Sequence, residues 1–200
     1  MKRVAVLASG RGTNLQALID ATRKGDIPAT IVLVVTDRED AQALKRGIQN
    51  FIKTLYLSPE GLSREAYDSL LLEILQANQV DVLALAGFMR ILSPVLIRAY
   101  PNKILNIHPS LLPAFPGLHA QRQALEYGVK VSGCTVHLVD EEVDHGPIIL
   151  QRTVPVFDTD TEETLSARIL EQEHLAYPEA LKLLAEDRLI LQGRRVLIRQ

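Results

Sequence analysis

The chain has one cysteine, no long apolar run and no excess of basic residues, and each absence removes a class of protein. Because Cys134 stands alone, neither a disulfide framework nor a cysteine zinc site can form within one chain, and we expect a reducing, cytoplasmic setting. No stretch is long enough for a membrane-spanning helix, and the apolar run at 4–8 is too short for a signal peptide. With a formal net charge of -2, we expect neither a membrane nor a nucleic acid as partner.

The first half of the chain alternates apolar strands with amphipathic helical segments. The expected strands are 4–8, 31–36, 52–57, 80–86 and 104–107, and the expected helices between the first four are 14–24, 41–49 and 64–78. Strands that are apolar on both faces belong to parallel sheets covered by helices. We therefore predict an α/β fold, a single Rossmann-like domain over 1–200 with a mostly parallel sheet flanked by helices.

The second half changes character after residue 130. Ser93 and Pro94 first predict the start of a short helix toward Tyr100. Two longer strands, 132–139 and 147–156, then favour an antiparallel pair across an acidic turn. A long helix from 161 to about 186 follows, with Thr159…Glu162 and Asp160…Glu163 as candidate capping boxes, and 188–191 with 195–198 predict a terminal hairpin.

Asn106 and His108 are two residues apart at the end of a predicted strand. Side chains alternate along a strand, so these two point to one face while Leu105 and Ile107 point to the other. An amide can donate to an oxyanion and an imidazole can move a proton. His108 alone favours a structural histidine, but the pair at a sheet end favours a functional site for chemistry on a carbonyl.

A glycine-rich turn, 9–14, follows the first strand and opens the first helix. Free backbone N–H groups there suit a phosphate. Leu15 takes the third glycine position of a dinucleotide fingerprint, and no Gly-Lys-Ser/Thr of a Walker loop follows. A turn without a ligand is an equally good interpretation of this segment alone.

Two acidic residues have open interpretations. Asp144 lies in an acidic run that usually forms a solvated loop, although a carboxylate near His108 would keep the imidazole protonated. Glu173 falls within the apolar stripe of the last helix, where it either sits hydrated at the rim or faces a ligand pocket.

The remaining polar candidates carry weaker signals. Arg90 lies in the segment 86–92, which follows a core strand. We expect the aromatic and aliphatic side chains of this segment to be exposed, as suits a pocket for a flat heterocycle. His119, His137, His145 and His174 show no metal-ligand spacing, so we expect hydrogen-bonding or surface roles and no metal. Cys134 is expected to be a small buried hydrophobe.

Five segments together resemble the folate-dependent phosphoribosylglycinamide formyltransferases of purine biosynthesis, over nearly the whole chain. The segments are 9–16, 86–93, 106–113, 116–119 and 144–149. This family commonly has glycine where this chain has His145. The resemblance implies no role for the chain after Arg188.

The resemblance also implies a role for particular residues. Gly12, Thr13 and Asn14 would hold the ribonucleotide phosphate, and Glu173 would contact the glycinamide substrate. The folate-binding residues would be Arg64, Met89, Arg90, Ile91, Leu92, Asn106, Val139, Asp140 and Glu141. The phosphate-binding half would be about 1–100, and the folate-binding and catalytic half, with Asn106, His108 and Asp144 as catalytic residues, about 101–200.

The implied reaction is formyl transfer from 10-formyltetrahydrofolate to the amine of glycinamide ribonucleotide, by a monomer or weak homodimer without a metal. Asn106 and protonated His108 would hold a tetrahedral oxyanion, with Asp144 tuning the histidine. A formyltetrahydrofolate hydrolase, a non-catalytic nucleotide-binding module and a nicotinamide dehydrogenase are the alternatives. A methionyl-tRNA formyltransferase would need a further tRNA-binding domain and positive surface, which 200 residues at net charge -2 do not offer.

Overall fold

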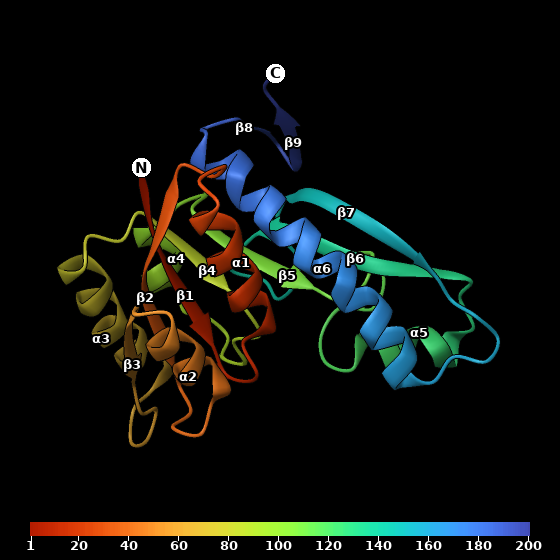
Figure 1. Ribbon diagram of the computed structural model, residues 1–200, viewed down its shortest axis with the longest axis horizontal. Coiled ribbons are helices and arrows are strands. Elements are labelled where there is room, and N and C mark those ends of the chain that lie inside the picture. Colours follow the sequence, from red (N-terminus) through yellow and green to blue (C-terminus); the bar gives the residue numbers. More distant parts are fainter.

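The computed structural model describes residues 1–200 and builds one nine-stranded sheet with helices on both faces (Figure 1). The strands are β1 (Lys2–Ala8), β2 (Ala29–Thr36), β3 (Lys53–Tyr56), β4 (Val82–Leu85), β5 (Ile104–His108), β6 (Val131–Leu138), β7 (Ile148–Pro155), β8 (Leu189–Gln192) and β9 (Arg195–Ile198). The helices are α1 (Thr13–Arg23), α2 (Gln42–Gln49), α3 (Arg64–Ala77), α4 (Pro94–Ala99), α5 (Ala120–Tyr127) and α6 (Glu162–Ala185).

The strand order is β3-β2-β1-β4-β5-β6-β7-β9-β8. The first five strands in this order are parallel, and β6 and β7 continue the sheet in antiparallel pairing. The terminal hairpin β8–β9 joins the edge through a single parallel pair between β7 and β9, Ile148 with Arg195. The predicted mostly parallel α/β sheet with antiparallel strands in the C-terminal half is confirmed.

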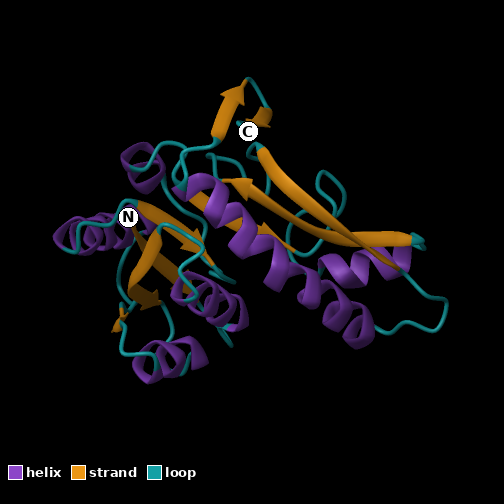
Figure 2. Cartoon of the chain, turned by 45° about the horizontal axis from the view of Figure 1, so that its top comes forward, coloured by secondary structure: helices purple, strands orange, loops and turns teal.

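Each face of the sheet carries its own hydrophobic core, and alternate residues of β1 enter different cores. Val4, Val6 and Ala8 pack on the face covered by α1 and α6. Ala5 and Leu7 pack on the opposite face, against α3 and α4. Figure 2 shows the long helix α6 lying across the paired strands β6 and β7. A strand with both faces buried needs apolar residues at every position, which explains the unbroken apolar run.

The N-terminus of α6 differs from the predicted caps, whereas α4 begins where it was predicted. The N-cap of α6 is Thr161, whose hydroxyl accepts from the Thr164 N–H, while the Thr164 hydroxyl accepts from the Thr161 N–H. The capping boxes predicted at Thr159 and Asp160 are therefore wrong, because Asp160 instead accepts from Arg168. Ser93 is the N-cap residue of α4, as predicted, but its hydroxyl makes no cap bond.

One helix was not predicted. Helix α5 has only eight residues and buries only Ala120 and Ala124 fully. The residue before it, His119, has a left-handed backbone conformation. Two buried positions give little hydrophobic periodicity from which to predict a helix, and the segment before them is rich in proline. No helix in the structure combines the length and the apolar composition needed to span a lipid bilayer.

Candidate functional site

Strands β1, β4 and β5 end side by side, and the candidate site lies at their carboxyl ends. Because β1 has β2 on one side and β4 on the other, the direction of winding reverses here, which is where open α/β sheets form ligand crevices. The Ser9 hydroxyl accepts from the Met89 N–H at 2.9 Å and donates to an Asp37 carboxylate oxygen at 2.6 Å. These bonds hold Met89 and so fix the position of the segment 87–92, which lines the site.

A cavity of about 440 Å³ opens at these strand ends, and we call it the folate-facing cavity because the sequence resemblance assigns part of its lining to folate. It is lined by Leu85, Gly87, Phe88, Met89, Arg90, Ile91, Leu92, Asn106, Ile107, His108, Pro109, Gly117, Leu118, His119, Ala120, Gln121, His137, Val139, Asp140, Glu142, Val143 and Asp144. Most of the residues that the resemblance assigns to folate therefore share one cavity. Arg64 and Glu141 do not line it. The Arg64 guanidinium lies 3.8 Å from the Glu65 carboxylate, and the Glu141 carboxylate lies 3.6 Å from the Arg98 guanidinium.

His108 and Asp144, distant in sequence, face each other across this cavity. The His108 Nδ1 atom lies 3.4 Å from the Asp144 Oδ2 atom, and both side chains are nearly buried, 7% and 11% exposed. On its other side, the His108 Nε2 atom lies 2.8 Å from the carbonyl oxygen of Phe115. A carbonyl can only accept, so Nε2 carries a proton, and any second proton on the ring must sit on Nδ1, facing Asp144.

Asn106 is oriented by His137, which stands opposite it in the β5–β6 pairing. The His137 Nδ1 atom lies 2.9 Å from the Leu138 carbonyl oxygen, so Nδ1 donates and Nε2 is free to accept. The Asn106 amide nitrogen lies 3.2 Å from that Nε2 atom and donates to it. Burial lowers the pKa of His137, which favours this neutral ring. One amide hydrogen of Asn106 is thus bonded to His137, and the other is available to donate to a ligand.

Asp144 belongs to the acidic loop, which we define as residues 139–146 between β6 and β7. Its backbone is left-handed, with φ of 51°, a conformation that Asp tolerates better than most residues. The Gly117 N–H donates to its Oδ2 atom at 2.8 Å. Gly146 closes the loop, and a Cβ built there would lie 1.7 Å from the Leu138 carbonyl oxygen. Glycine is therefore required at this close approach.

A second cavity of about 1010 Å³ adjoins the first, and we call it the acceptor cavity because it is lined by Asn14 and Glu173, which the sequence resemblance assigns to the acceptor substrate. Gly87, Ile107, Pro109 and Gln121 line both cavities. Glu173 of α6 and Asn14 of α1 lie on the far wall, where the Asn14 amide donates to the Glu173 Oε1 atom at 3.4 Å.

Glu173 is a buried carboxyl group, only 7% exposed, in a helix stripe that is otherwise apolar. Burial raises its pKa to about 7, and the bond from Asn14 opposes that rise in part. The side chain lines the acceptor cavity, so of the two interpretations from sequence the structure favours the one that faces a pocket.

The glycine-rich turn brings the N-terminus of α1, which includes Asn14, to the acceptor cavity. Gly12 is the N-cap, with φ of 72°, and a Cβ there would lie 2.9 Å from the Ala43 backbone. Arg46 of α2 supports the turn, since its Nε donates to the Arg11 carbonyl oxygen at 2.7 Å. This contact between α2 and the turn has no signal in the sequence.

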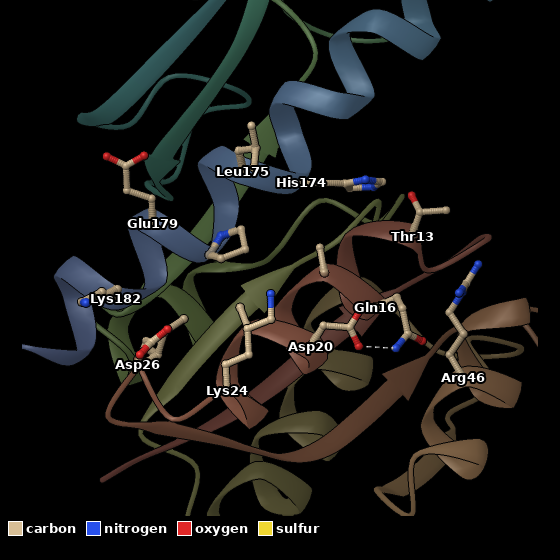
Figure 3. A pocket seen from close by; sticks show the side chains of 14 residues that line it. Thr13, Gln16, Asp20, Lys24, Asp26, Arg46, His174, Leu175, Glu179 and Lys182 are labelled. Atoms are coloured by element: carbon tan, nitrogen blue, oxygen red, sulfur yellow. Dashed lines mark hydrogen bonds between the residues drawn. The ribbon is translucent and has the colours of Figure 1, made fainter.

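A third cavity, of about 730 Å³, lies between α1 and α6 (Figure 3). Thr13, His174 and Arg46 gather at one end of it in Figure 3. Burial and the nearby Arg46 lower the pKa of His174, and its Nε2 atom is buried without a partner. Of the predicted phosphate residues, Thr13 lies on this cavity and Asn14 on the acceptor cavity.

Arg90 is packed more tightly than a loop arginine. Its guanidinium lies 4.1 Å from the centre of the Tyr67 ring, and its Nε atom is buried without a partner. Beside it, the Ser93 N–H donates to the buried Asp68 carboxylate at 2.5 Å. Burial raises the pKa of Asp68, and the bonds from Ser93 oppose that rise.

Tyr177 joins α6 to the strand ends below the site. Its hydroxyl lies 2.6 Å from the Leu85 carbonyl oxygen and 3.2 Å from the Leu105 carbonyl oxygen. These carbonyls belong to β4 and β5. The sequence shows Tyr177 only as a residue of a long helix.

Comparisons with known proteins agree with this geometry. The model of the family described as formyl transferase matches residues 2–181. Phosphoribosylglycinamide formyltransferase of Escherichia coli is 48% identical over 187 residues, covering 93% of this chain and 88% of the relative. The trifunctional purine biosynthetic protein adenosine-3 of Drosophila melanogaster is 52% identical over 92% of this chain, but the chain spans only 14% of that protein.

A solved structure gives the same result. Glycinamide ribonucleotide transformylase 1 from Symbiobacterium toebii superposes with a TM-score of 0.98 at 55% identity, covering 100% of this chain and 95% of that one. The resemblance predicted from sequence motifs is confirmed, and the family implies a folate-derived formyl donor. The chain belongs to the formyl transferase family.

Proposed function

We propose that this chain is a single formyltransferase domain over 1–200 that transfers the formyl group of 10-formyltetrahydrofolate to the amine of glycinamide ribonucleotide, in purine biosynthesis. The observation that carries this proposal is the pair of adjoining cavities with Asn106, His108 and Asp144 on one and Glu173 on the other. Two substrates bound in adjoining cavities can meet at a shared wall, as group transfer requires.

The folate-facing cavity suits a flat, partly polar ring. Its walls include the whole segment 87–92, in which two apolar side chains are unusually exposed, Met89 at 62% and Ile91 at 52%. Exposed apolar residues around a cavity are expected where a ligand covers them. We propose that Met89, Arg90, Ile91, Leu92, Val139 and Asp140 contact the folate, with Arg64 and Glu141 further out along it.

The acceptor cavity suits a phosphorylated amine. We propose that the turn at Gly12, Thr13 and Asn14 receives the phosphate, since backbone N–H groups and the positive end of a helix dipole favour an anion there. Glu173, buried on the same wall, would hold the amide end of the acceptor through a hydrogen bond. This supports an acceptor that carries both groups.

In the reaction, the neutral amine of the acceptor attacks the formyl carbon and the carbonyl oxygen becomes an oxyanion. Asn106 donates its remaining amide hydrogen to that oxyanion, because the other is held by His137. His108 donates from Nδ1, since its Nε2 proton is held by the Phe115 carbonyl. Asp144 lies beside Nδ1 and stabilises the charged ring.

Collapse of the tetrahedral species returns the carbonyl and breaks the bond to the folate nitrogen. The attacking amine loses one proton, and Asp144 helps to accept it through water. The same water passes that proton on to the departing folate nitrogen, so tetrahydrofolate leaves as a neutral amine. Proton count and charge balance without a further reagent.

One assay tests the proposal and its main rival. Protein, 10-formyltetrahydrofolate and glycinamide ribonucleotide are mixed, and absorbance of the folate product is followed with and without the ribonucleotide. Release that depends on the ribonucleotide supports transfer. Release that is equal without it supports a formyltetrahydrofolate hydrolase, and no release in either case supports a non-catalytic binding module.

A further inference from the structure

The turn of the terminal hairpin reaches back to the acidic loop. Strand β9 pairs with β7 at Ile148, two residues beyond the end of that loop. Arg194, in the turn between β8 and β9, therefore lies beside His145. This brings the last part of the chain to the loop that carries Asp144.

Arg194 makes contacts to both the side chain and the backbone of His145. Its Nη1 atom lies 3.2 Å from the His145 Nε2 atom, and its Nη2 atom donates to the His145 carbonyl oxygen. On the other edge of the ring, Nδ1 lies 2.7 Å from an Asp140 carboxylate oxygen. One imidazole thus connects the guanidinium at the C-terminal hairpin to the beginning of the acidic loop.

The hydrogen-bond roles along this chain are mutually consistent. Arginine can only donate, so the His145 Nε2 atom accepts, and the ring proton sits on Nδ1, where it donates to Asp140. Each group then has the partner that it requires. Arg194 lies in the segment to which the sequence assigned no role.

Few other contacts hold the outer side of the acidic loop. Within the loop, the Glu142 N–H donates to an Asp140 carboxylate oxygen, and the Glu142 carboxylate lies 3.8 Å from the His145 Nε2 atom. Glu141 is 3.6 Å from Arg98, with both side chains more than half exposed. The inner side is held by the Gly117 N–H on Asp144. Loss of the Arg194 contacts would leave the outer side to fluctuate.

We propose that Arg194 is a positioning residue, which keeps the acidic loop closed against the folate-facing cavity by holding the backbone and ring of His145. The inference rests on the proposed function, because that cavity is where the formyl donor binds. Arg194 touches neither substrate. It acts by raising the population of the loop conformation that binds the donor.

This role has a specific kinetic signature. If only part of the free protein has a closed loop, the apparent affinity for the donor falls by that fraction, whereas a saturating donor closes the loop again. Arg194→Ala should therefore raise the KM for 10-formyltetrahydrofolate by about two-fold to five-fold, the range expected for losing exposed charged contacts. The kcat and the KM for the ribonucleotide should stay unchanged.

The test compares Arg194→Ala with Arg195→Ala, a matched control on the same hairpin. The Arg195 side chain is exposed and takes part in none of the side-chain hydrogen bonds or ion pairs of the structure. Steady-state kinetics give the KM and kcat values, and hydrogen–deuterium exchange of the free protein reports opening of residues 140–146. We expect faster exchange in this segment and a higher donor KM in Arg194→Ala alone.

Equal exchange and equal donor KM in the two variants would overturn the proposal. Faster exchange without a change in donor KM would overturn it too, because the contact would then fasten the surface without positioning the loop. If the wild-type protein transfers no formyl group, the proposed function fails. The exchange comparison then decides separately whether Arg194 holds the loop.

Discussion

At the residue scale, His108 has partners on both ring nitrogens, and this decides what the ring can do. The Phe115 carbonyl holds the Nε2 proton, and Asp144 faces Nδ1. Rotation of the ring would lose both interactions, so the ring is oriented before any substrate binds. Such preorganised groups contribute more to catalysis than groups that must first reorient.

Removing the amide of Asn106 tests the oxyanion assignment. Asn106→Ala should lower kcat by about a hundredfold or more, the usual cost of losing one oxyanion donor. Folding should be unaffected, since the residue is only partly buried. Stopped-flow or steady-state turnover, with circular dichroism as the folding check, measures both, and normal turnover would refute the role.

The charge of Asp144 can be removed without changing the backbone. Asn tolerates the left-handed conformation found at this position, and its side-chain oxygen can still accept from the Gly117 N–H. Asp144→Asn should therefore fold normally and lose about tenfold to a hundredfold in kcat, because the charged imidazole loses its counter-charge.

A matched control is available for this variant. Asp187 has a similar φ of 54° and an exposed side chain, paired with Lys2 at 3.0 Å and far from the site in the fold. Asp187→Asn should leave kcat unchanged. Equal kcat values for the two variants would remove Asp144 from the mechanism.

The raised pKa of Glu173 predicts a pH-dependent stability. Its pKa is about 7 in the folded chain against an ordinary value of 4.5, so the folded state binds more protons between these values. Stability from this group is full below about pH 4.5 and is lost as pH rises to about 7. Above that range the buried charge costs on the order of 3 kcal/mol.

Glu173→Gln removes that cost. We expect the variant to unfold at a higher temperature than the wild-type protein at pH 8, with little difference at pH 5. Thermal unfolding at both pH values measures this, with Glu171→Gln, an exposed position on the same helix, as the control. A stabilisation that is equal at both pH values would contradict the burial argument.

At the scale of elements, the acidic loop depends on one glycine. A Cβ at Gly146 would overlap the Leu138 carbonyl oxygen, so Gly146→Ala must displace the end of β6. We expect a loss of about 1–3 kcal/mol in the free energy of unfolding, measured with urea. Gly10→Ala, where nothing lies within 4 Å, should cost far less, and an equal loss would contradict the prediction.

The elements that were predicted best are those whose pattern is local. The buried strands read as apolar runs, and the pair Asn106 and His108 follows from alternation along β5. Contacts between distant elements carry no such pattern. The pairing of Asn106 with His137 depends on the β5–β6 register, and the approach of Asp144 to His108 is implied only by the family resemblance.

Helix α5 and the α6 cap show a different reason for failure. The cap at Thr161 competes with Thr159 and Asp160, which have similar local propensity, but Asp160 instead accepts from Arg168, from the Phe157 N–H and from the Thr164 hydroxyl. In α5, packing against α6 stabilises a segment whose own sequence is a weak helix signal. In both cases tertiary contacts decide between locally similar choices.

At the scale of the whole molecule, the sheet is held unevenly along its width. The central strand β1 is almost wholly inaccessible to solvent from Val4 to Ala8, whereas the terminal hairpin joins the edge through one residue pair. Hydrogen exchange should therefore be slowest in β1, β4 and β5 and fastest in β8–β9. Exchange in the hairpin as slow as in β1 would contradict this gradient.

Helix α6 presents Glu173 to the acceptor cavity and, one turn later, Tyr177 to the carbonyl oxygens of β4 and β5. The rise of an α-helix over four residues, about 6 Å, therefore sets the spacing between the acceptor wall and the floor beneath Asn106. Helix α6 therefore fixes the distance between these two parts of the site. If the proposed acceptor binds there, α6 could not shift to accommodate one with a longer span between its phosphate and its amine without moving the Tyr177 hydroxyl away from the carbonyl oxygens of β4 and β5.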